Sequence, residues 1–426
     1  MKKFLDKILA LLAKNILRKY RPEIIGITGS VGKTSAKEAV FAVLKNKFNV
    51  RQNIKNYNTE IGLPLTIIGA KSGHKNILKW LAVFFQALGL LIIRDKKYPK
   101  ILVLEMGADH PGDIAHLVKI APCDLSLVTA VSATHLEFFG SVENVKKEKE
   151  NIVAHQKQNN VAILNYDDEL VMAMAKKTSA RIVTVGFREG ADFRATDINF
   201  GFDKDARRSY LVFKLHHNGS IVPVKIENAL AKTHIYSFLF AAAVATEKKM
   251  GLMEIIEVLK NFYPPKGRMN LLDGIKNTQI IDDTYNSSPK AAQAALEILN
   301  ELPCAGRKIA VLGDMLELGA ETEAEHKTIG KKVAELNLDL LFAVGERAHY
   351  FVDGALSAGF DKNKTFHFDD SGSAGRFLQD KLEAGDLVLV KGSQGVRLEK
   401  IVKEIMAEPN RAKELLVRQD EDWMGK

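Results

Sequence analysis

A glycine-rich run near the start of the chain has the residue types and spacing of a phosphate-binding loop. It reads GITGSVGKTS over residues 26–35, directly after an apolar segment and directly before a helical pattern at 36–44. Glycines let backbone N–H groups converge on phosphate oxygens, and a helix N-terminus adds the positive end of its dipole. Lys33 is spaced to reach β- and γ-phosphates and the Thr34 hydroxyl to hold Mg²⁺, although Ile27 stands where the strict motif has glycine. We therefore predict a nucleoside triphosphate site formed by Gly29, Ser30, Gly32, Lys33, Thr34 and Ser35.

Three further polar residues in the first half of the chain could take part in this chemistry. Glu105 directly follows the apolar run 101–104, where a carboxylate needs a partner such as Mg²⁺, a helix N-terminus or a cation. His135 ends the polar segment after another apolar run and could be a metal ligand, a general base or an ordinary polar residue. Lys149 follows among other lysines, and on its own it reads as a solvated surface charge.

Polar clusters also follow the apolar runs of the second half of the chain. Asn286 precedes a helical pattern that Ser287 or Ser288 could cap, and its amide suits hydrogen bonding to a nucleotide base. Asp314 follows the next run, where a carboxylate could hold a ribose hydroxyl, and residues 391–393 follow the last one. Each cluster is weak evidence alone, but together they line one predicted sheet edge.

The elements that would position these residues alternate between short apolar runs and helical patterns. Continuous apolar runs are typical of parallel strands covered on both faces. Between two alternating runs, Asn218 and Gly219 predict the turn of a β-hairpin. The predicted buried strands are 101–104, 125–128, 161–164, 181–185, 278–281, 309–312, 340–344, 365–368 and 387–390.

This order of elements predicts an α/β protein with two sheets. The segment YPPKG at 263–267 cannot continue a helix and marks a boundary. We predict an N-terminal amphipathic helix at 1–22, a P-loop domain with a mostly parallel sheet at 23–263, and a Rossmann-like open α/β domain at 264–426. An apolar insert falls at about 71–100. The site is expected in a cleft between the two α/β domains.

Composition limits the classes of function. The chain has 426 residues, 46% hydrophobic content and a formal net charge of +9. Its basic residues are mixed with acidic ones, which argues against a dedicated nucleic-acid surface and suits small anionic substrates. Cys123 and Cys304 form neither a disulfide framework nor a metal-ligand cluster and are expected to be buried small residues. We expect a monomer in the reducing cytoplasm.

Two apolar stretches raise the question of a membrane. The stretch 4–20 places Ile8, Leu12 and Ile16 on one helical face but is interrupted by charges, and no cleavage site follows it. The stretch 77–93 is more apolar but too short for a confident span of about 20 residues. Both predict helices packed on the domain, with peripheral membrane or partner contact as the alternative.

Taken together, these motifs resemble those of the Mur ligase family, in the family's order and from about residue 24 to about 405. LGDMLELG at 312–319 followed by His326 is characteristic of the branch that adds D-alanyl-D-alanine to UDP-N-acetylmuramoyl-tripeptide, although nothing in the sequence explains the histidine. The matching segments are 28–35, 58–66 (NTEIGLPLT), 105–108, 135–141 (HLEFFGS), 267–269 (GRM), 285–289, 313–319 and 391–393.

The resemblance implies an ATP-dependent amide ligation in peptidoglycan precursor synthesis, through an acyl phosphate. By position, Lys33 would stabilise the transferring phosphoryl group, Thr34 would hold one Mg²⁺, and Glu105 and His135 would hold a second. Lys149 aligns with the lysine that the family carbamylates, with Lys146 and Lys147 as alternatives because Lys-Glu-Asn-Ile replaces the usual Lys-Gly-Glu-Ile. The residues implied to bind the nucleotide from the C-terminal domain are Arg268 (phosphates), Asn286 (adenine) and Asp314 (ribose).

One departure leaves alternatives open. The family carries an N-terminal domain that grips the uridine nucleotide, whereas here the phosphate loop begins after only about 25 residues, so that domain is expected to be missing. A ligase of the same scaffold acting on another carboxylate and amine, in cofactor or polyamino-acid synthesis, is therefore the alternative. A nucleotide-dependent interaction protein would not need the second metal site, and a P-loop kinase or GTPase would not need the second α/β domain.

Overall fold

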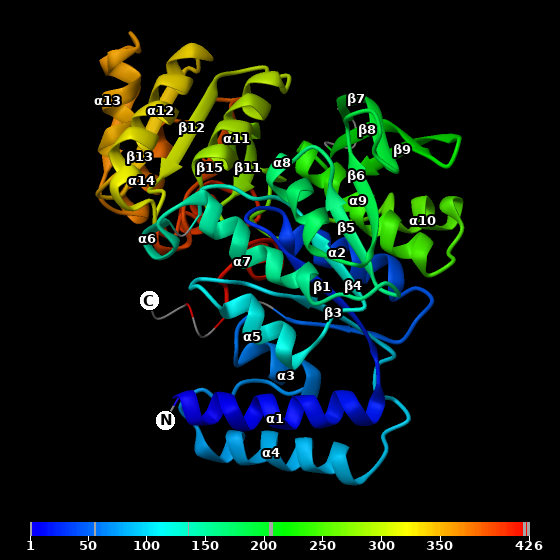
Figure 1. Cartoon of the computed structure of the whole chain (residues 1–426). Coiled ribbons are helices and arrows are strands. Elements are labelled where there is room, and N and C mark those ends of the chain that lie inside the picture. The colour runs from blue at the N-terminus through cyan, green and yellow to red at the C-terminus, as the bar shows by residue number, and fades with distance from the viewer. Residues whose placement is uncertain (1, 55–56, 135, 204–207, 421–422, 424–426) are drawn as a thin grey trace. The chain divides into compact units, whose positions relative to one another are not determined.

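The computed structural model describes residues 2–54, 57–134, 136–203, 208–420 and 423, and it contains two compact units (Figure 1). The division that the sequence predicts at 263 and 264 is compatible with these units but stays a prediction. The first unit comprises Met1–Asp197, Phe213–Val224 and Ile235–Phe262, and the second comprises Ile198–Val212, Lys225–His234 and Tyr263–Lys426.

A nine-stranded sheet, seven of whose strands pair in parallel, positions the phosphate loop. The parallel strands are, in spatial order, β2 (Val50–Gln52), β3 (Ile101–Glu105), β1 (Glu23–Thr28), β4 (Leu125–Val128), β5 (Val161–Asn165), β6 (Arg181–Gly186) and β7 (Phe193–Asp203). The sheet continues through β8 (Arg208–His217) and β9 (Ser220–Glu227). The hairpin prediction is confirmed, because Asn218 and Gly219 between β8 and β9 both have positive φ, at 46° and 76°.

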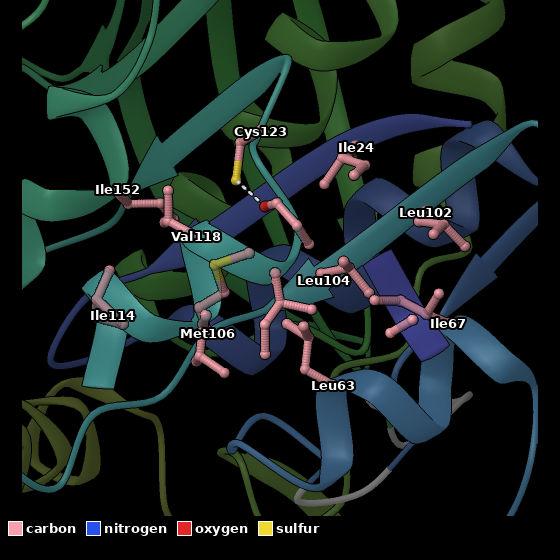
Figure 2. Close-up of a cluster of buried hydrophobic side chains, with 14 of the residues drawn as sticks. Ile24, Leu63, Ile67, Leu102, Leu104, Met106, Ile114, Val118, Cys123 and Ile152 are labelled. Carbon is pink, nitrogen blue, oxygen red and sulfur yellow. Dashed lines mark hydrogen bonds between the residues drawn. The ribbon is translucent and has the colours of Figure 1, made fainter. Parts of the chain in front are cut away.

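Helices cover the parallel strands of the first unit. On one face, alternate residues such as Leu102 and Leu104 of β3 join a core with Ile114 and Ile152 (Figure 2). Ile101 and Val103 are also buried but do not belong to this core, as the alternation of side chains along a strand requires. Burial raises the pKa of the Cys123 thiol in this core to about 12, so Cys123 is the inert residue that was expected, whereas Cys304 in the second unit is partly exposed. The helices are α2 (Lys33–Leu44), α3 (Gly62–Ile68), α5 (Asp113–Ile120), α6 (Leu136–Phe139), α7 (Val142–Ala154), α8 (Glu169–Met172), α9 (Lys232–Glu247) and α10 (Leu252–Leu259).

The two apolar stretches form α1 (Lys2–Tyr20) and α4 (Ile77–Ile92), which lie side by side (Figure 1). The prediction for the packed face of α1 was wrong by about one residue. Leu9, Ala13 and Ile16 are buried against the domain, and Ile8 and Leu12 lie at the edge of the contact. The buried face of α1 is the one that contacts α3 and α4. The apolar pattern of α1 alone does not indicate where those two helices lie. Among the described residues, no helix combines the length and apolar character needed to cross a bilayer.

The second unit is an open sheet wound on both faces, as predicted. Its strands follow the order β10 (Asn270–Asp273), β11 (Gln279–Asp283), β15 (Leu387–Lys391), β12 (Lys308–Gly313), β13 (Leu340–Val344) and β14 (Thr365–Phe368), all parallel except the edge strand β10. Alternate residues of β12 serve two separate cores, Ala310 and Leu312 in one and Ile309 and Val311 in the other. The helices are α11 (Pro289–Glu301), α12 (Thr322–Glu335), α13 (His349–Ser357), α14 (Ser371–Lys381), α15 (Glu399–Ile405) and α16 (Ala412–Leu415).

Candidate active site

The phosphate loop joins the end of β1 to the start of α2, as its sequence predicts. Gly29 has a φ of 146° and Gly32 a φ of 86°, both in the region that favours glycine. A Cβ atom on Gly29 would lie 2.0 Å from the Thr129 hydroxyl oxygen, so no larger residue fits there without displacing the segment after β4. The loop glycines therefore set both the backbone turn and its close packing.

Hydrogen bonds to the segment after β4 hold this loop in place. The Ser30 amide donates to the Ala130 carbonyl at 2.7 Å, and the Thr129 hydroxyl donates to the Val31 carbonyl at 2.6 Å. The Ser132 amide donates to Ser30 Oγ at 3.0 Å. The loop is thus fixed by its neighbours before any ligand binds, which lowers the entropy cost of binding.

Lys33 is the first residue of α2 and folds back over the loop. Its Nζ donates to the Gly29 carbonyl at 2.7 Å, so the ammonium group stays at the mouth of the loop. Thr34 is partly exposed beside it, and Ser35 is buried. A cation and a hydroxyl next to a helix N-terminus form an arrangement that binds a polyphosphate with its magnesium ion.

Glu105 ends β3, directly beside the strand that leads into the phosphate loop. In the parallel register it pairs with Ile27 of β1, and it is buried. Asn58 Nδ2 donates to Glu105 Oε1 at 3.1 Å, and Asn53 Oδ1 accepts from the Glu105 amide at 2.9 Å. The sequence analysis noted the segment 58–66 but gave Asn58 no role, because only the fold brings it to β3.

Lys149 is buried on α7, contrary to the surface charge that it suggested when read alone. Burial, and then the positive charge of Lys33, lower the pKa of the Lys149 ammonium to about 7. On the same helix Lys147 is exposed, and Lys146 forms an ion pair with Glu143 at 3.1 Å. Of the three lysines that the sequence left open, only Lys149 is buried, and its pKa of about 7 leaves a large part of its amine neutral at pH 7.

The donor set of this edge fits magnesium better than a transition metal. Thr34 and Glu105 both offer oxygen, the donor that Mg²⁺ prefers. Within the described part of the chain, no three His, Cys, Asp or Glu side chains are grouped as metal ligands. His135, predicted as a ligand and as a catalytic residue, lies outside the described residues, so its role stays a prediction.

In the second unit, the loop after β11 carries an aromatic and cationic cluster. The Arg268 guanidinium lies 4.1 Å from the centre of the Tyr285 ring. Its buried Nε has no hydrogen-bond partner among the described residues, which points to an anionic group missing from this position. Asn286 is exposed beside it, with its carbonyl fixed by Lys391 Nζ at 3.0 Å.

Asp314, predicted to hold a ribose hydroxyl, follows β12 and is largely buried. Only 7% of it is exposed, and burial raises the pKa of its carboxyl group. One carboxylate oxygen accepts from the Arg347 amide at 3.1 Å. A ribose contact would have to use the other oxygen, and it stays a prediction.

Hydrogen bonds show what Ser288 and His326 do in this unit. Ser288 occupies the N-cap position of α11, but its side chain makes no capping hydrogen bond, and Pro289 opens the helix instead. His326 is fully buried and binds the loop after β12, donating from Nδ1 to the Thr322 carbonyl at 2.6 Å and accepting from the Met315 amide at 3.0 Å. This pairing requires a neutral ring, and burial lowers the pKa of His326 to about 4. The histidine that follows LGDMLELG therefore holds that loop in shape.

Comparison with known families gives two matches along the chain. A model described as the Mur ligase middle domain matches residues 87–245, and one described as the Mur ligase, glutamate ligase domain matches residues 267–394. The two matches follow each other in the order of the first and second units.

Curated relatives match over most of the chain. The UDP-N-acetylmuramoyl-tripeptide–D-alanyl-D-alanine ligase of Bacillus subtilis is 28% identical over 398 residues, covering 93% of this chain and 79% of that protein. The enzyme of the same name from Synechocystis is 31% identical, covering 90% and 75%. The crystal structure of the MurF ligase of Thermotoga maritima in complex with ADP is 30% identical with a TM-score of 0.76, covering 94% and 83%.

Proposed function

Because this chain belongs to the Mur ligase family, we propose that it joins D-alanyl-D-alanine to a UDP-N-acetylmuramoyl-tripeptide with hydrolysis of ATP. The observation that carries the proposal is the edge where the formed phosphate loop, Glu105 and the buried Lys149 meet in the first unit. The enzymes named for this reaction match the chain through both units, which favours these substrates over another carboxylate and amine. We place the reaction in the cytoplasm, where ATP is available, and expect a monomer.

The reaction requires positioning and charge neutralisation more than covalent help from the protein. The tripeptide carboxylate attacks the γ-phosphorus, a new O–P bond forms, and the bridging P–O bond to ADP breaks. The amine of D-alanyl-D-alanine then attacks the acyl carbon, the amine loses a proton, and inorganic phosphate leaves. Negative charge on the phosphoryl oxygens is greatest in the first step.

Lys33 and the loop amides provide the main electrostatic contribution. The Lys33 ammonium gives up the Gly29 carbonyl and moves onto the γ-phosphoryl oxygens, where it offsets charge as the bridging bond breaks. Since hydrogen bonds to the segment after β4 already hold the loop, its amide dipoles need little rearrangement. Bound Mg²⁺ would supply further charge neutralisation to the phosphates, with one ion held by Thr34 and a second held by Glu105 and His135.

Lys149 is proposed to act as a carbamate. Its neutral amine attacks the carbon of CO₂, an N–C bond forms, a C=O electron pair moves onto oxygen, and the nitrogen releases a proton to water. The product is an anionic oxygen donor in place of a cation, which would complete an oxygen site for a second Mg²⁺. Its lowered pKa supports this assignment because only the neutral amine reacts.

The residues of the second unit are proposed to bind the nucleotide. Arg268, with its unpartnered buried Nε, would pair with phosphate oxygens. Asn286 would hydrogen bond to adenine from its exposed position, and Asp314 would hold the ribose through its second carboxylate oxygen.

Phosphate release from ATP and Mg²⁺, measured with each substrate omitted in turn, tests the proposal. We expect release to require both the UDP-linked tripeptide and D-alanyl-D-alanine, with the pentapeptide seen by mass spectrometry. Lys33→Ala should lower the rate by about 10³-fold, while Lys45→Ala, an exposed lysine at the end of the same helix, should leave it unchanged. Release that needs neither substrate, or an active Lys33→Ala variant, would overturn the assignment. Protein that binds ATP but releases no phosphate would retain the scaffold and exclude these substrates.

A further inference from the structure

Helix α4 presents an apolar face that no described residue of the first unit covers. Val83 and Ala87 are buried against the domain, whereas on the opposite side Phe85 is 71% exposed and Ile92 is 79% exposed. The large exposed apolar residues of this face are Ile77, Leu78, Leu81, Phe85, Leu88, Ile92 and Ile93. A contiguous surface of this kind, formed by one helix, marks an interaction site.

Spacing along α4 places these side chains together. Leu78, Leu81, Phe85, Leu88 and Ile92 recur at intervals of three and four residues, so they form one stripe along the helix. The helix contains no acidic residue, and its polar Gln86 turns back to donate to the Ile68 and Gly69 carbonyls at 3.3 and 3.2 Å. The one charged residue of the helix, Lys79, is exposed but falls outside the three-and-four spacing of the stripe. The stripe itself therefore consists of apolar side chains.

The charge around this helix is strongly one-sided. Residues 1–20 contain six basic residues and one acidic residue, and residues 71–100 contain seven and one. The rest of the chain has 48 basic and 50 acidic residues, so the whole excess of +9 resides in these two segments. Lys7 and Arg18 on α1, and Arg94, Lys96 and Lys97 after α4, are exposed.

The two helices form a fixed layer rather than a loose appendage (Figure 1). Lys19 Nζ donates to the Leu90 and Leu91 carbonyls at 2.8 and 2.9 Å, and the Tyr20 hydroxyl donates to the Ile93 carbonyl at 3.1 Å. These bonds satisfy the carbonyls at the C-terminal end of α4, which a helix otherwise leaves unpaired. The apolar stripe is thus held outward by the neighbouring helix.

We propose that the α1–α4 layer docks on the surface of a lipid bilayer that carries anionic headgroups, with α4 lying in the plane of the interface. An apolar helical face flanked by basic residues has the two signals that stable peripheral binding requires. A second copy of the chain is disfavoured as the occupant, because pairing two such layers would bring two concentrations of positive charge together. The proposal is independent of the ligase activity.

Co-sedimentation with vesicles tests it, using phosphatidylcholine alone and phosphatidylcholine with phosphatidylglycerol. We expect the parent to bind the anionic vesicles, and salt to weaken this binding. Phe85→Glu should bind at least tenfold more weakly, because it removes the apolar contact of one aromatic ring. Met253→Glu is the matched control, since Met253 is an apolar residue 67% exposed on α10, and it should bind like the parent. Lys96→Glu combined with Lys97→Glu leaves the apolar face intact and should lose at least about tenfold on anionic vesicles only.

Each other outcome contradicts the proposal. Equal binding to both vesicle types, or no loss in the charge-reversed variant, would exclude the anionic surface. Failure of the parent to bind, with a dimer in light scattering that Phe85→Glu dissociates, would assign the stripe to a second copy. Failure to bind without any dimer would reject docking altogether. Circular dichroism and phosphate release establish that each variant is folded. Phe85→Glu tests the apolar contribution to vesicle binding, and the charge-reversed variant tests the electrostatic contribution separately.

Discussion

The two units each bury a lysine at the carboxyl end of a sheet, and the two lysines have different surroundings. Lys391 ends β15 and forms an ion pair with Asp283 at 2.6 Å, with Asn286 as a further acceptor. Lys149 on α7 has Lys33 as its largest charged influence, which adds to the effect of burial in lowering its pKa. Burial by itself therefore does not distinguish a structural lysine from a reactive one.

The partner decides what a buried lysine can do. The ion pair with Asp283 makes Lys391 a brace between β15 and the end of β11. Burial, together with the neighbouring Lys33 cation, lowers the pKa of Lys149 to about 7, so a large part of its amine is neutral and nucleophilic. The usual interpretation of a buried lysine as a structural residue therefore applies to Lys391 and not to Lys149.

The largest expected effect is on Lys391. Lys391→Met should lower the free energy of unfolding by about 3–5 kcal/mol, because Asp283 is left buried without its cation. Lys403→Met, an exposed lysine on α15, is the control and should change little. Denaturant titrations measure both. Full stability of Lys391→Met would show that the pair is not a brace, and recovery in Lys391→Met with Asp283→Asn would confirm the cause.

Loss of the Lys149 amine should affect activity rather than folding. Lys149→Ala is expected to lower phosphate release by about 100-fold, the usual cost of removing a group that supports a metal site. Acetate or another short carboxylate should restore part of the rate by replacing the carbamate oxygens, while Lys147→Ala on the exposed side of α7 should need no rescue. A fully active Lys149→Ala variant would disprove the carbamate.

Removing the Lys149 amine should raise the free energy of unfolding, although it lowers activity. The pKa of Lys149 is about 7 in the folded state against 10.5 as its reference, so between these values the unfolded chain binds more protons and parent stability rises with pH. In bicarbonate-free buffer at pH 7, Lys149→Met should therefore gain on the order of 2 kcal/mol, a gain that shrinks toward pH 10. Denaturant titrations at pH 7, 8.5 and 10 measure it. A variant less stable than the parent at every pH would contradict the lowered pKa.

The smallest expected effect is on His326, whose hydrogen bonds require an uncharged ring. His326→Ala should cost about 1–2 kcal/mol at pH 7, because the Met315 amide loses its acceptor. Since the folded pKa is about 4 and the reference is 6.5, the parent should lose stability as the pH falls from 6.5 to 4, and the variant should lose less. The exposed His349→Ala is the control. Identical acid profiles for parent and His326→Ala would refute the neutral ring.

Much of the fold could be predicted because its strands bury both faces. The continuous apolar runs at β3, β5 and β15 have few alternatives in a chain of this size, and Asn218 with Gly219 suits one kind of turn. The strands β2, β7 and β10 were missed. The few residues of β2 and β10 carry no distinct pattern, so that pairing alone makes them strands, and β7 was not recognised between β6 and the hairpin.

The residues of the candidate site were likewise predicted only in part from the sequence. The phosphate loop was found because its chemistry lies in one contiguous segment, whose glycines the turn requires. Asn58, which holds Glu105, was missed because its contact joins residues far apart in the chain. His326 was noticed but not explained. Its partner Thr322 lies one turn away on α12, but Met315 reaches the ring only through the folded loop after β12.

The sequence by itself determined the phosphate loop, the order of strands and helices, and the family to which the chain belongs, because each rests on local spacing or on contiguous motifs. Tertiary structure alone decided which lysine of α7 is buried, which face of α1 is packed, and which apolar residues of α4 remain exposed. The physical reason is that burial and pKa depend on what other segments place around a residue. A lysine with the same neighbours in sequence is a surface charge or a nucleophile according to the fold that encloses it.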